Sequence, residues 1–255
     1  MPTPPPNPPP PPPPSRNRNR NPILLGDYIT APTNDASLAA TPYAGLETYD
    51  LAAFLSDWES LHRAALARLG EGGRIHPTAF IHPRAIVGDD VIVGPGARVW
   101  EFSTVRKGSV LGAGAQVGFN CEVTASYVGE GAVLGHRIGV NRTLVGAGAH
   151  LSAGVTVAAI HMSGDMRRPD REVITRTPHG IYRCGTTRFG ALIGDHVQTG
   201  NTLSLGPGTA IGRRTLIHSG VTLAARAVPA DSVVTTPHTS EATVHPRRRR
   251  ATRDG

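Results

Sequence analysis

The chain has 255 residues, with 30 glycines and 23 prolines but only 5% aromatic residues. This composition excludes a broad core built on aromatic side chains and favours a thin one lined by Ile, Val and Leu. Two cysteines, Cys121 and Cys184, cannot make a disulfide framework, so we expect a reducing, cytoplasmic environment. Because no apolar run reaches the roughly 18 residues of a membrane span and the N-terminus lacks a secretion-signal pattern, we expect no membrane association.

The net charge of +7 lies entirely in the two ends of the chain. Residues 1–21 contain three arginines and no acid, and residues 246–255 contain five arginines and one aspartate. The part between them has no net charge, so we expect no nucleic-acid partner. We interpret both runs as solvated tails, and binding of an acidic partner or of phosphates to them stays open.

The N-terminal part of the chain, up to Gly70, divides into three predicted segments. Residues 1–21 are rich in Pro and Arg, cannot pack a core, and are predicted to be disordered. Residues 22–47 are interpreted as a linker of small residues. Apolar residues then recur at steps of three and four, which predicts an amphipathic helix over 48–70, with Asp50 as N-cap and Gly70 as the C-terminal stop.

A six-residue repeat begins directly after this helix. Residues 75–122 divide into eight consecutive six-residue units, or hexads: IHPTAF, IHPRAI, VGDDVI, VGPGAR, VWEFST, VRKGSV, LGAGAQ and VGFNCE. The first position is always Ile, Val or Leu, the fifth is never larger than valine, and the second is Gly in half of them. A strict period of six with Gly at corners predicts an all-β fold, a parallel β-helix. Each hexad supplies one short strand and a corner, and three hexads make one coil.

The repeat continues to the C-terminal region with three departures. It resumes from Val123 to Val157 and again from Ile193 to Leu223, which gives 21 hexads, or about seven coils, within residues 74–234. Two hexads, 123–127 and 140–144, are one residue short. Open ends of a solenoid expose core and backbone edges, so we expect helix 48–70 to cap the end of the first coil. Residues 235–255 are predicted to form a disordered basic tail.

The third departure is an insertion at residues 161–192. The runs "REVITRT" and "IYRCGTTR" on either side of Pro-His-Gly predict a hairpin. Long insertions on one face of a solenoid often help to form a binding site.

These repeats resemble those of the hexapeptide acyltransferases, which are left-handed β-helices. The run "EVTASYVGEGAVLGHRIGV…LVGAGAHLSAGVTV" resembles the glucosamine-1-phosphate acetyltransferase domain of the bifunctional uridylyltransferase/acetyltransferase enzymes, with short hexads at the same places. The order of helix, β-helix and a hairpin loop ending in "RFGALIGD" resembles the stand-alone members of that group. The resemblance covers about residues 48–235. It implies a homotrimer with sites between subunits and acetyl-CoA as donor.

The resemblance also implies roles for individual residues. His136 in "LGH" matches the histidine that acts as general base, and Arg106 in "VRKG" matches an arginine that contacts the sugar phosphate. Ala153 in "LSAG" matches the alanine whose backbone meets the CoA arm. Asn201 and Ser219 occupy small polar positions further along, and we expect them to help bind the cofactor.

Most of the family's sugar pocket is changed in this chain. Thr124 replaces a Lys, Gly139 a Tyr, His150 an Asn, and Ala159-Ile160 an Asn-Tyr pair. One hypothesis is that a different amine or hydroxyl is acylated in a pocket rebuilt by His150, His161 and a loop arginine, Arg167 or Arg168. The other is that activity has been lost and the scaffold kept.

Acyl transfer from a thioester needs a base near the acceptor, and a neutral imidazole suits this task near neutral pH. We therefore expect a CoA-dependent acyltransferase of nucleotide-sugar metabolism, acetylating an amino-sugar phosphate or a sugar nucleotide. The alternative is a non-catalytic trimer that acts as scaffold or partner of a sugar nucleotidyltransferase. No metal is expected, because no two of His136, His150 and His161 have the close spacing of the zinc-binding β-helices.

Overall fold

The computed structural model describes residues 21–162, 165–223 and 225–236. Nearly all of both predicted tails lies outside these ranges. Four helical segments come first: η1 (Leu25–Asp27), α1 (Ala36–Ala39), η2 (Pro42–Thr48) and α2 (Leu51–Gly73).

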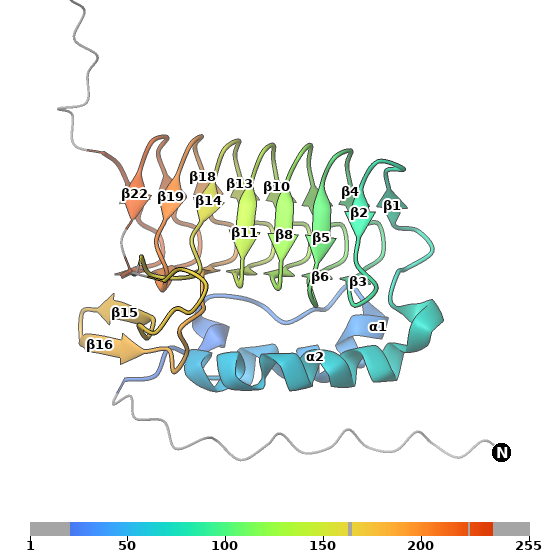
Figure 1. The fold of residues 1–255 in the computed structure, drawn as a ribbon, viewed down its shortest axis with the longest axis horizontal. Coiled ribbons are helices and arrows are strands. Elements are labelled where there is room, and N and C mark those ends of the chain that lie inside the picture. The colour runs from blue at the N-terminus through green and yellow to red at the C-terminus, as the bar shows by residue number, and fades with distance from the viewer. Residues whose placement is uncertain (1–20, 163–164, 224, 237–255) are drawn as a thin grey trace, which may run out of the picture.

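Short parallel strands then form a prism with three faces (Figure 1). The first face holds β1 (Phe80–Ile81), β4 (Arg98–Val99), β7 (Gln116–Val117), β10 (Val133–Leu134), β13 (His150–Leu151), β18 (Gln198–Thr199), β21 (Leu216–Ile217) and β24 (Val233–Val234). The second face holds β2 (Ile86–Val87), β5 (Thr104–Arg106), β8 (Glu122–Thr124), β11 (Gly139–Asn141), β14 (Thr156–Val157), β19 (Ser204–Leu205) and β22 (Thr222–Leu223). The third face holds β3 (Ile92–Val93), β6 (Val110–Leu111), β9 (Tyr127–Val128), β12 (Leu144–Val145), β17 (Ala191–Ile193), β20 (Thr209–Ile211) and β23 (Ala227–Val228).

The pairing register confirms the predicted left-handed β-helix. Phe80 lies opposite Arg98, three full hexads further along the chain. Val133 lies opposite His150, one residue less than three full hexads further on, because the coil between them contains a short hexad. Beyond the predicted hexads the repeat adds β23 and β24, so the first face has eight strands and the other two have seven.

The core of the prism is a stack of aliphatic side chains, as the first hexad positions predicted. Val99, Val117, Leu134 and Leu151 are fully buried, one from each of four successive coils on the first face. Cys121 fills one of the small fifth positions and is 2% exposed. Stacking like residues on strands about 4.8 Å apart gives a continuous apolar core without large aromatic side chains.

The predicted helix is confirmed, but its position differs from the expectation that it caps the first coil. Asp50 caps α2 by accepting a hydrogen bond from the Ala52 amide, and the regular helix breaks at Gly70, where φ is +67°. α2 runs along the third face rather than across the open end (Figure 1). The reason is that the outward residues of this face are apolar in one coil after another, whereas on the other faces they are apolar in only some coils. The buried ones on the third face are Ile92, Val110, Tyr127, Leu144, Leu192 and Ala210, all at most 2% exposed.

The segment expected to be a linker, residues 22–47, is instead an ordered part of this covering layer. Leu25, Ile29 and Leu38 are fully buried in the same cluster as α2 and the third face. Asp195, from the corner after β17, fastens the segment by accepting hydrogen bonds from the amide and hydroxyl of Thr30. Its small residues suggested a linker. Its apolar residues in fact complete the hydrophobic cluster between α2 and the third face.

The inserted hairpin is confirmed as β15 (Ile174–Thr177) and β16 (Gly180–Arg183), paired antiparallel around Pro178 and His179. Its buried Tyr182 reaches the start of α2. The Tyr182 hydroxyl donates to Asp50 Oδ1 and accepts from the Ala52 amide, each at 2.7 Å. The insertion therefore helps to hold the N-terminus of α2.

A buried histidine on α2 predicts how stability depends on pH. His62 Nε2 donates to the Asp90 carbonyl at 2.7 Å, so its Nδ1 is free to accept from the Tyr43 hydroxyl at 2.9 Å, as a neutral ring requires. Burial lowers the pKa of His62, and the hydrogen bond to Asp90 only partly opposes this. The unfolded chain therefore binds this proton more readily, so stability is lost as pH falls below about 6.5.

We expect the free energy of unfolding, measured with urea between pH 5 and 7.5, to rise with pH. The His62→Gln variant should show a flatter profile. His179→Gln, which removes an exposed histidine of the inserted hairpin, is the control and should keep the slope of the parent protein. An unchanged slope in His62→Gln would show that the neutral ring is not the cause.

Candidate functional site

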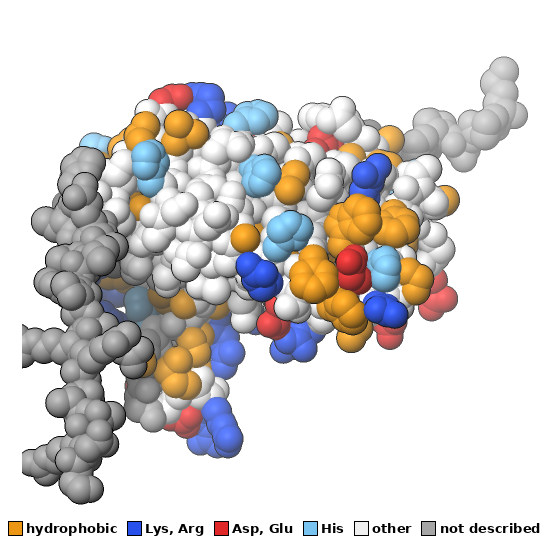
Figure 2. All heavy atoms as spheres, turned by 90° about the horizontal axis from the view of Figure 1, so that it is seen from above, with side chains coloured by type: hydrophobic (Ala, Val, Ile, Leu, Met, Phe, Trp, Pro, Cys, Tyr) orange, Lys and Arg blue, Asp and Glu red, His pale blue; other side chains and the backbone are white. Residues whose placement is uncertain are grey.

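The corner that joins the first and second faces forms a column of stacked turns. One residue of each successive coil occupies the same position in it: Glu101, Phe119, His136, Ala153, Asn201 and Ser219. Each of the first five accepts, through its carbonyl, an amide of the next coil. The donors are Asn120, Arg137, Gly154, Thr202 and Gly220, at 2.8 to 3.1 Å. We call these six residues the corner column; Figure 2 looks down on this edge of the prism.

The structure therefore brings the predicted base and the three predicted cofactor residues into one line. His136, Ala153, Asn201 and Ser219 follow one another in consecutive coils, each about 4.8 Å further along the axis. The insertion leaves the prism between Ala153 and Asn201 without breaking this line, because Thr202 N donates to the Ala153 carbonyl at 2.8 Å.

His136 and His150 share one surface pocket. Both side chains are exposed, and they line a hollow of about 390 Å³ together with Trp100, Glu101 and Phe119. The pocket offers two imidazoles, a carboxylate and two aromatic walls, a set suited to an acceptor with an amine or hydroxyl on a ring. Neither His161 nor the arginines of the insertion are among the residues that line it.

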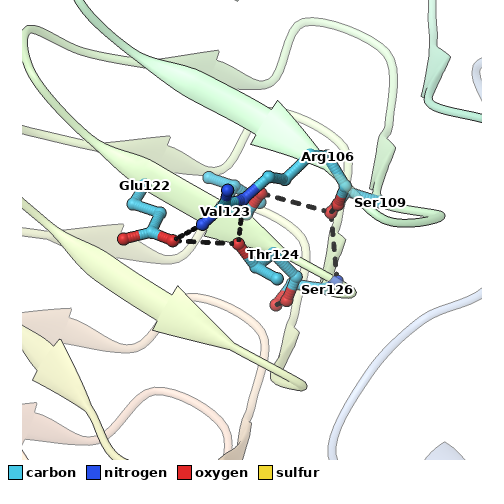
Figure 3. Close-up of polar contacts among 6 residues, drawn as sticks. All are labelled: Arg106, Ser109, Glu122, Val123, Thr124 and Ser126. Atoms are coloured by element: carbon cyan, nitrogen blue, oxygen red, sulfur yellow. Dashed lines mark hydrogen bonds and ion pairs between the residues drawn. The ribbon is translucent and has the colours of Figure 1, made fainter. Parts of the chain in front are cut away.

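Arg106 lies apart from His136, on β5 of the second face. It lines a different hollow of about 450 Å³, to which Arg137, the neighbour of His136, also contributes. Its guanidinium forms an ion pair with Glu122, and its Nε donates to Thr124 Oγ1 at 3.3 Å (Figure 3). The predicted phosphate ligand is thus already engaged by a carboxylate and a hydroxyl.

The corner beneath Arg106 is held by small hydroxyl residues. Ser109 Oγ donates to the Arg106 carbonyl at 2.7 Å and accepts from the Ser126 amide at 3.2 Å (Figure 3). Thr124, which replaces the family's lysine, is 4% exposed. It therefore serves the local network rather than reaching into solvent.

The predicted cofactor residues form a chain of hydrogen bonds. The Ala153 amide donates to Asn201 Oδ1 at 3.1 Å, and the Asn201 amide donates to Ser219 Oγ at 2.9 Å. Within the described ranges, the side-chain NH₂ of Asn201 and the hydroxyl hydrogen of Ser219 have no acceptor. These two donors, together with the second lone pair of the Ala153 carbonyl, can bind the amides of an extended arm.

A cluster of exposed aromatic side chains, two of which line the His136 pocket, was missed by the sequence interpretation. Phe80 packs on Trp100 with ring centroids 5.4 Å apart, and Phe102 on Phe119 at 5.7 Å. All four are between 37% and 51% exposed. Figure 2 shows hydrophobic side chains gathered at this end of the edge. The sequence does contain a signal for them. These aromatic residues stand at outward or corner positions of the first three coils, where most hexads carry small or polar residues.

Across the residues that the structure describes, no three His, Cys, Asp or Glu side chains come together as metal ligands do. Over those same residues, no helix is long and apolar enough to span a bilayer.

Comparison with known proteins identifies the repeat itself. The family described as bacterial transferase hexapeptide (six repeats) matches residues 72–107, which hold the end of α2 and the first coil with part of the second. Residues 72–107 therefore carry the hexapeptide repeat of that family, and in the structure the repeat continues beyond them as a β-helix. No curated protein matches this hexapeptide-repeat chain in sequence.

Several solved structures are similar to this hexapeptide-repeat chain. A mutant perosamine N-acetyltransferase from Caulobacter crescentus with CoA and GDP-perosamine is 18% identical over 69% of this chain and 59% of its own, with a TM-score of 0.32. The acetyltransferase domain of PglB from Neisseria gonorrhoeae with acetyl coenzyme A is 19% identical over 65% and 61%, with a TM-score of 0.30. The N-acyltransferase AntD from Bacillus cereus with dTDP and 3-hydroxybutyryl-CoA is 16% identical over 63% and 77%, with a TM-score of 0.36. The chain spans less than two thirds of the length of the first two.

Proposed function

We propose that this protein is a CoA-dependent acyltransferase that transfers an acyl group, most simply acetyl, to a sugar nucleotide or an amino-sugar phosphate. The observation that carries the proposal is the corner column. It sets an exposed imidazole, His136, in line with three residues that offer hydrogen bonds to an extended cofactor arm. Asn201 and Ser219 also hold the turns, but the His136 ring has no hydrogen-bond partner among the described residues, so folding does not account for it.

In this proposal His136 acts as the general base. The acceptor nitrogen or oxygen attacks the thioester carbonyl, the new bond to carbon forms, and the carbon–sulfur bond breaks. The imidazole takes the proton from the attacking group, and the departing sulfur leaves as the CoA thiolate. Such a base contributes roughly 10²–10⁴-fold to the rate.

The donor and the acceptor have separate places along the column. The arm of CoA lies along Ala153, Asn201 and Ser219, with its thioester toward His136. The acceptor enters the pocket of His136 and His150 from the first face. Its reactive group is then presented to the His136 imidazole, and the rest of the acceptor lies toward Phe119, Trp100 and the Glu101 carboxylate.

We also propose a homotrimer with its sites between subunits. α2 and the N-terminal segment cover the third face, whereas outward residues of the first and second faces, such as Arg98, Glu122 and His150, are exposed. The first and second faces, which meet at the corner column, are therefore left uncovered for a second copy.

One observation favours the alternative, a non-catalytic trimer that binds a sugar nucleotidyltransferase. Arg106 is engaged with Glu122 and Thr124, so the one phosphate ligand retained from the family is not free in this state. In the scaffold alternative, His136 can be removed without loss of partner binding.

Adding bulk to the column tests the cofactor site. Isothermal calorimetry should show micromolar binding of acetyl-CoA to the parent protein. Ala153→Phe should weaken binding by at least about tenfold, or 1.4 kcal/mol, because the ring fills the space of the arm. The matched control is Ala230→Phe, which adds the same ring at the same hexad position on an exposed corner of another edge. Equal affinity in both variants would place acetyl-CoA elsewhere.

A further inference from the structure

A second concave site lies away from the corner column, between α2 and the corner that joins the second and third faces. It has a volume of about 660 Å³ and is lined by residues of α2, of four successive coil corners and of the insertion. Small-molecule sites in proteins have volumes of about 300–1,000 Å³ and bring together residues far apart in the sequence. We call it the helix groove.

Cations outnumber acids in the helix groove. Four basic residues line it, and they face two carboxylates. The basic residues are Arg63, Lys107, Arg142 and Arg188, and the acids are Glu59 and Asp90. This excess occurs in a chain whose net charge outside its two tails is zero.

The ion pairs of the structure leave much of this charge unmatched. Arg142 lies 3.7 Å from Glu59, whose side chain is 78% exposed, so their attraction is weak. Among the described residues, Arg63 and Lys107 have no ion-pair partner. The groove therefore holds at least two cationic groups that are ready to bind an anion.

The backbone sets the spacing of the basic groups. Lys107 and Arg142 occupy the same corner position two coils apart, with Ala125 between them, as the bonds Ala125 N to Arg106 O and Arg142 N to Thr124 O show. Two coils correspond to about 10 Å along the axis. Arg63 reaches the same hollow from α2 on the opposite wall.

The α2 wall of the groove also carries apolar side chains beside Arg63. It includes Leu55, Leu66 and Trp58 of α2, and Trp58 is 7% exposed. A ligand that fits both walls has a negatively charged end and a planar or apolar end.

We infer that the helix groove binds a phosphorylated small molecule, with its phosphate groups between Lys107, Arg63 and Arg142 and its remainder against Trp58. Charge-assisted hydrogen bonds to phosphate oxygens supply most of the affinity. The site lies on a different edge of the prism from His136, so it stands independently of the proposed acyl transfer.

Trp58 offers a direct readout with pyrophosphate as the probe. The chain has two tryptophans, so the Trp100→Phe variant leaves Trp58 as the only one. Its fluorescence should change saturably as pyrophosphate is added, with equal ionic strength of sodium chloride as the reference. Lys107→Ala and Arg63→Ala should each weaken binding by about tenfold.

Three further variants should strengthen pyrophosphate binding or leave it unchanged. Glu59→Gln should strengthen binding a few-fold, because it removes the carboxylate that competes for Arg142. Arg98→Ala, which removes an exposed arginine of the first face, and His136→Ala should leave binding unchanged. An affinity unaltered by Lys107→Ala, or a sodium chloride titration that gives the same fluorescence change, would overturn the inference.

Discussion

The His136→Ala variant should bind acetyl-CoA like the parent protein and transfer acyl groups roughly 10²–10⁴-fold more slowly. His136 is exposed at a corner and contributes its backbone carbonyl, not its ring, to the hydrogen-bond ladder of the column. Its removal therefore takes away the base without altering the fold. The rate is measured as release of free CoA thiol in the presence of an amino-sugar nucleotide.

The matched control is His179→Ala, which removes an exposed histidine at the tip of the inserted hairpin. It should retain the full rate. Equal rates in His136→Ala and His179→Ala, with an acceptor that the parent protein acylates, would remove His136 from the mechanism.

The Asp195→Ala variant should be destabilised by about 3–5 kcal/mol, the usual cost of removing one partner of a buried ion pair. The Asp195 side chain is 5% exposed and lies 3.2 Å from Arg213. It also accepts hydrogen bonds from the Thr30 hydroxyl at 2.6 Å and from the Ala147 amide at 2.7 Å. One carboxylate thus joins the N-terminal segment to two coils.

Urea unfolding measures the loss of stability, and limited proteolysis shows which part of the chain is loosened. Cleavage should appear first between residues 22 and 35, because that segment loses its hydrogen bonds to Asp195 while the coils keep their core. Asp195→Asn keeps the shape of the side chain and one acceptor oxygen, so its effect should be smaller. A loss below about 1 kcal/mol in Asp195→Ala would mean that the segment is held by its apolar residues alone.

The coils could be predicted because their pattern is strict and local. Each inward residue is the first of a hexad, so counting from Ile75 finds the core, the corners and both short hexads. Counting in coils also places Arg106 directly opposite Thr124, one full coil later. The corner column follows from the same arithmetic once the insertion is recognised.

The position of α2 could not be predicted from its own apolar stripe, which tells what is buried but not against what. The missing information lies in the residue that precedes each inward position. On the third face this residue is apolar in every coil, as in Ile92, Val110 and Leu144, whereas on the other faces it is polar or Gly in most coils, as in Arg98 and Glu122. An outward apolar residue in every third hexad marks the face that a helix covers.

The side-chain partners of the candidate site were beyond the sequence. Nothing in the hexads indicates that Arg106 pairs with Glu122 rather than with a ligand. The linker interpretation of residues 22–47 failed because scattered apolar residues without a period acquire meaning only when a neighbouring surface is known. Residues 22–47 become ordered because their apolar side chains pack on the third face, and the segment alone does not show this.

A crystal structure of the protein soaked with CoA tests the central claim most directly. The proposed function predicts the CoA arm along Ala153, Asn201 and Ser219, with the sulfur beside the His136 imidazole. CoA bound only in the helix groove, or bound with its sulfur far from His136, would contradict it.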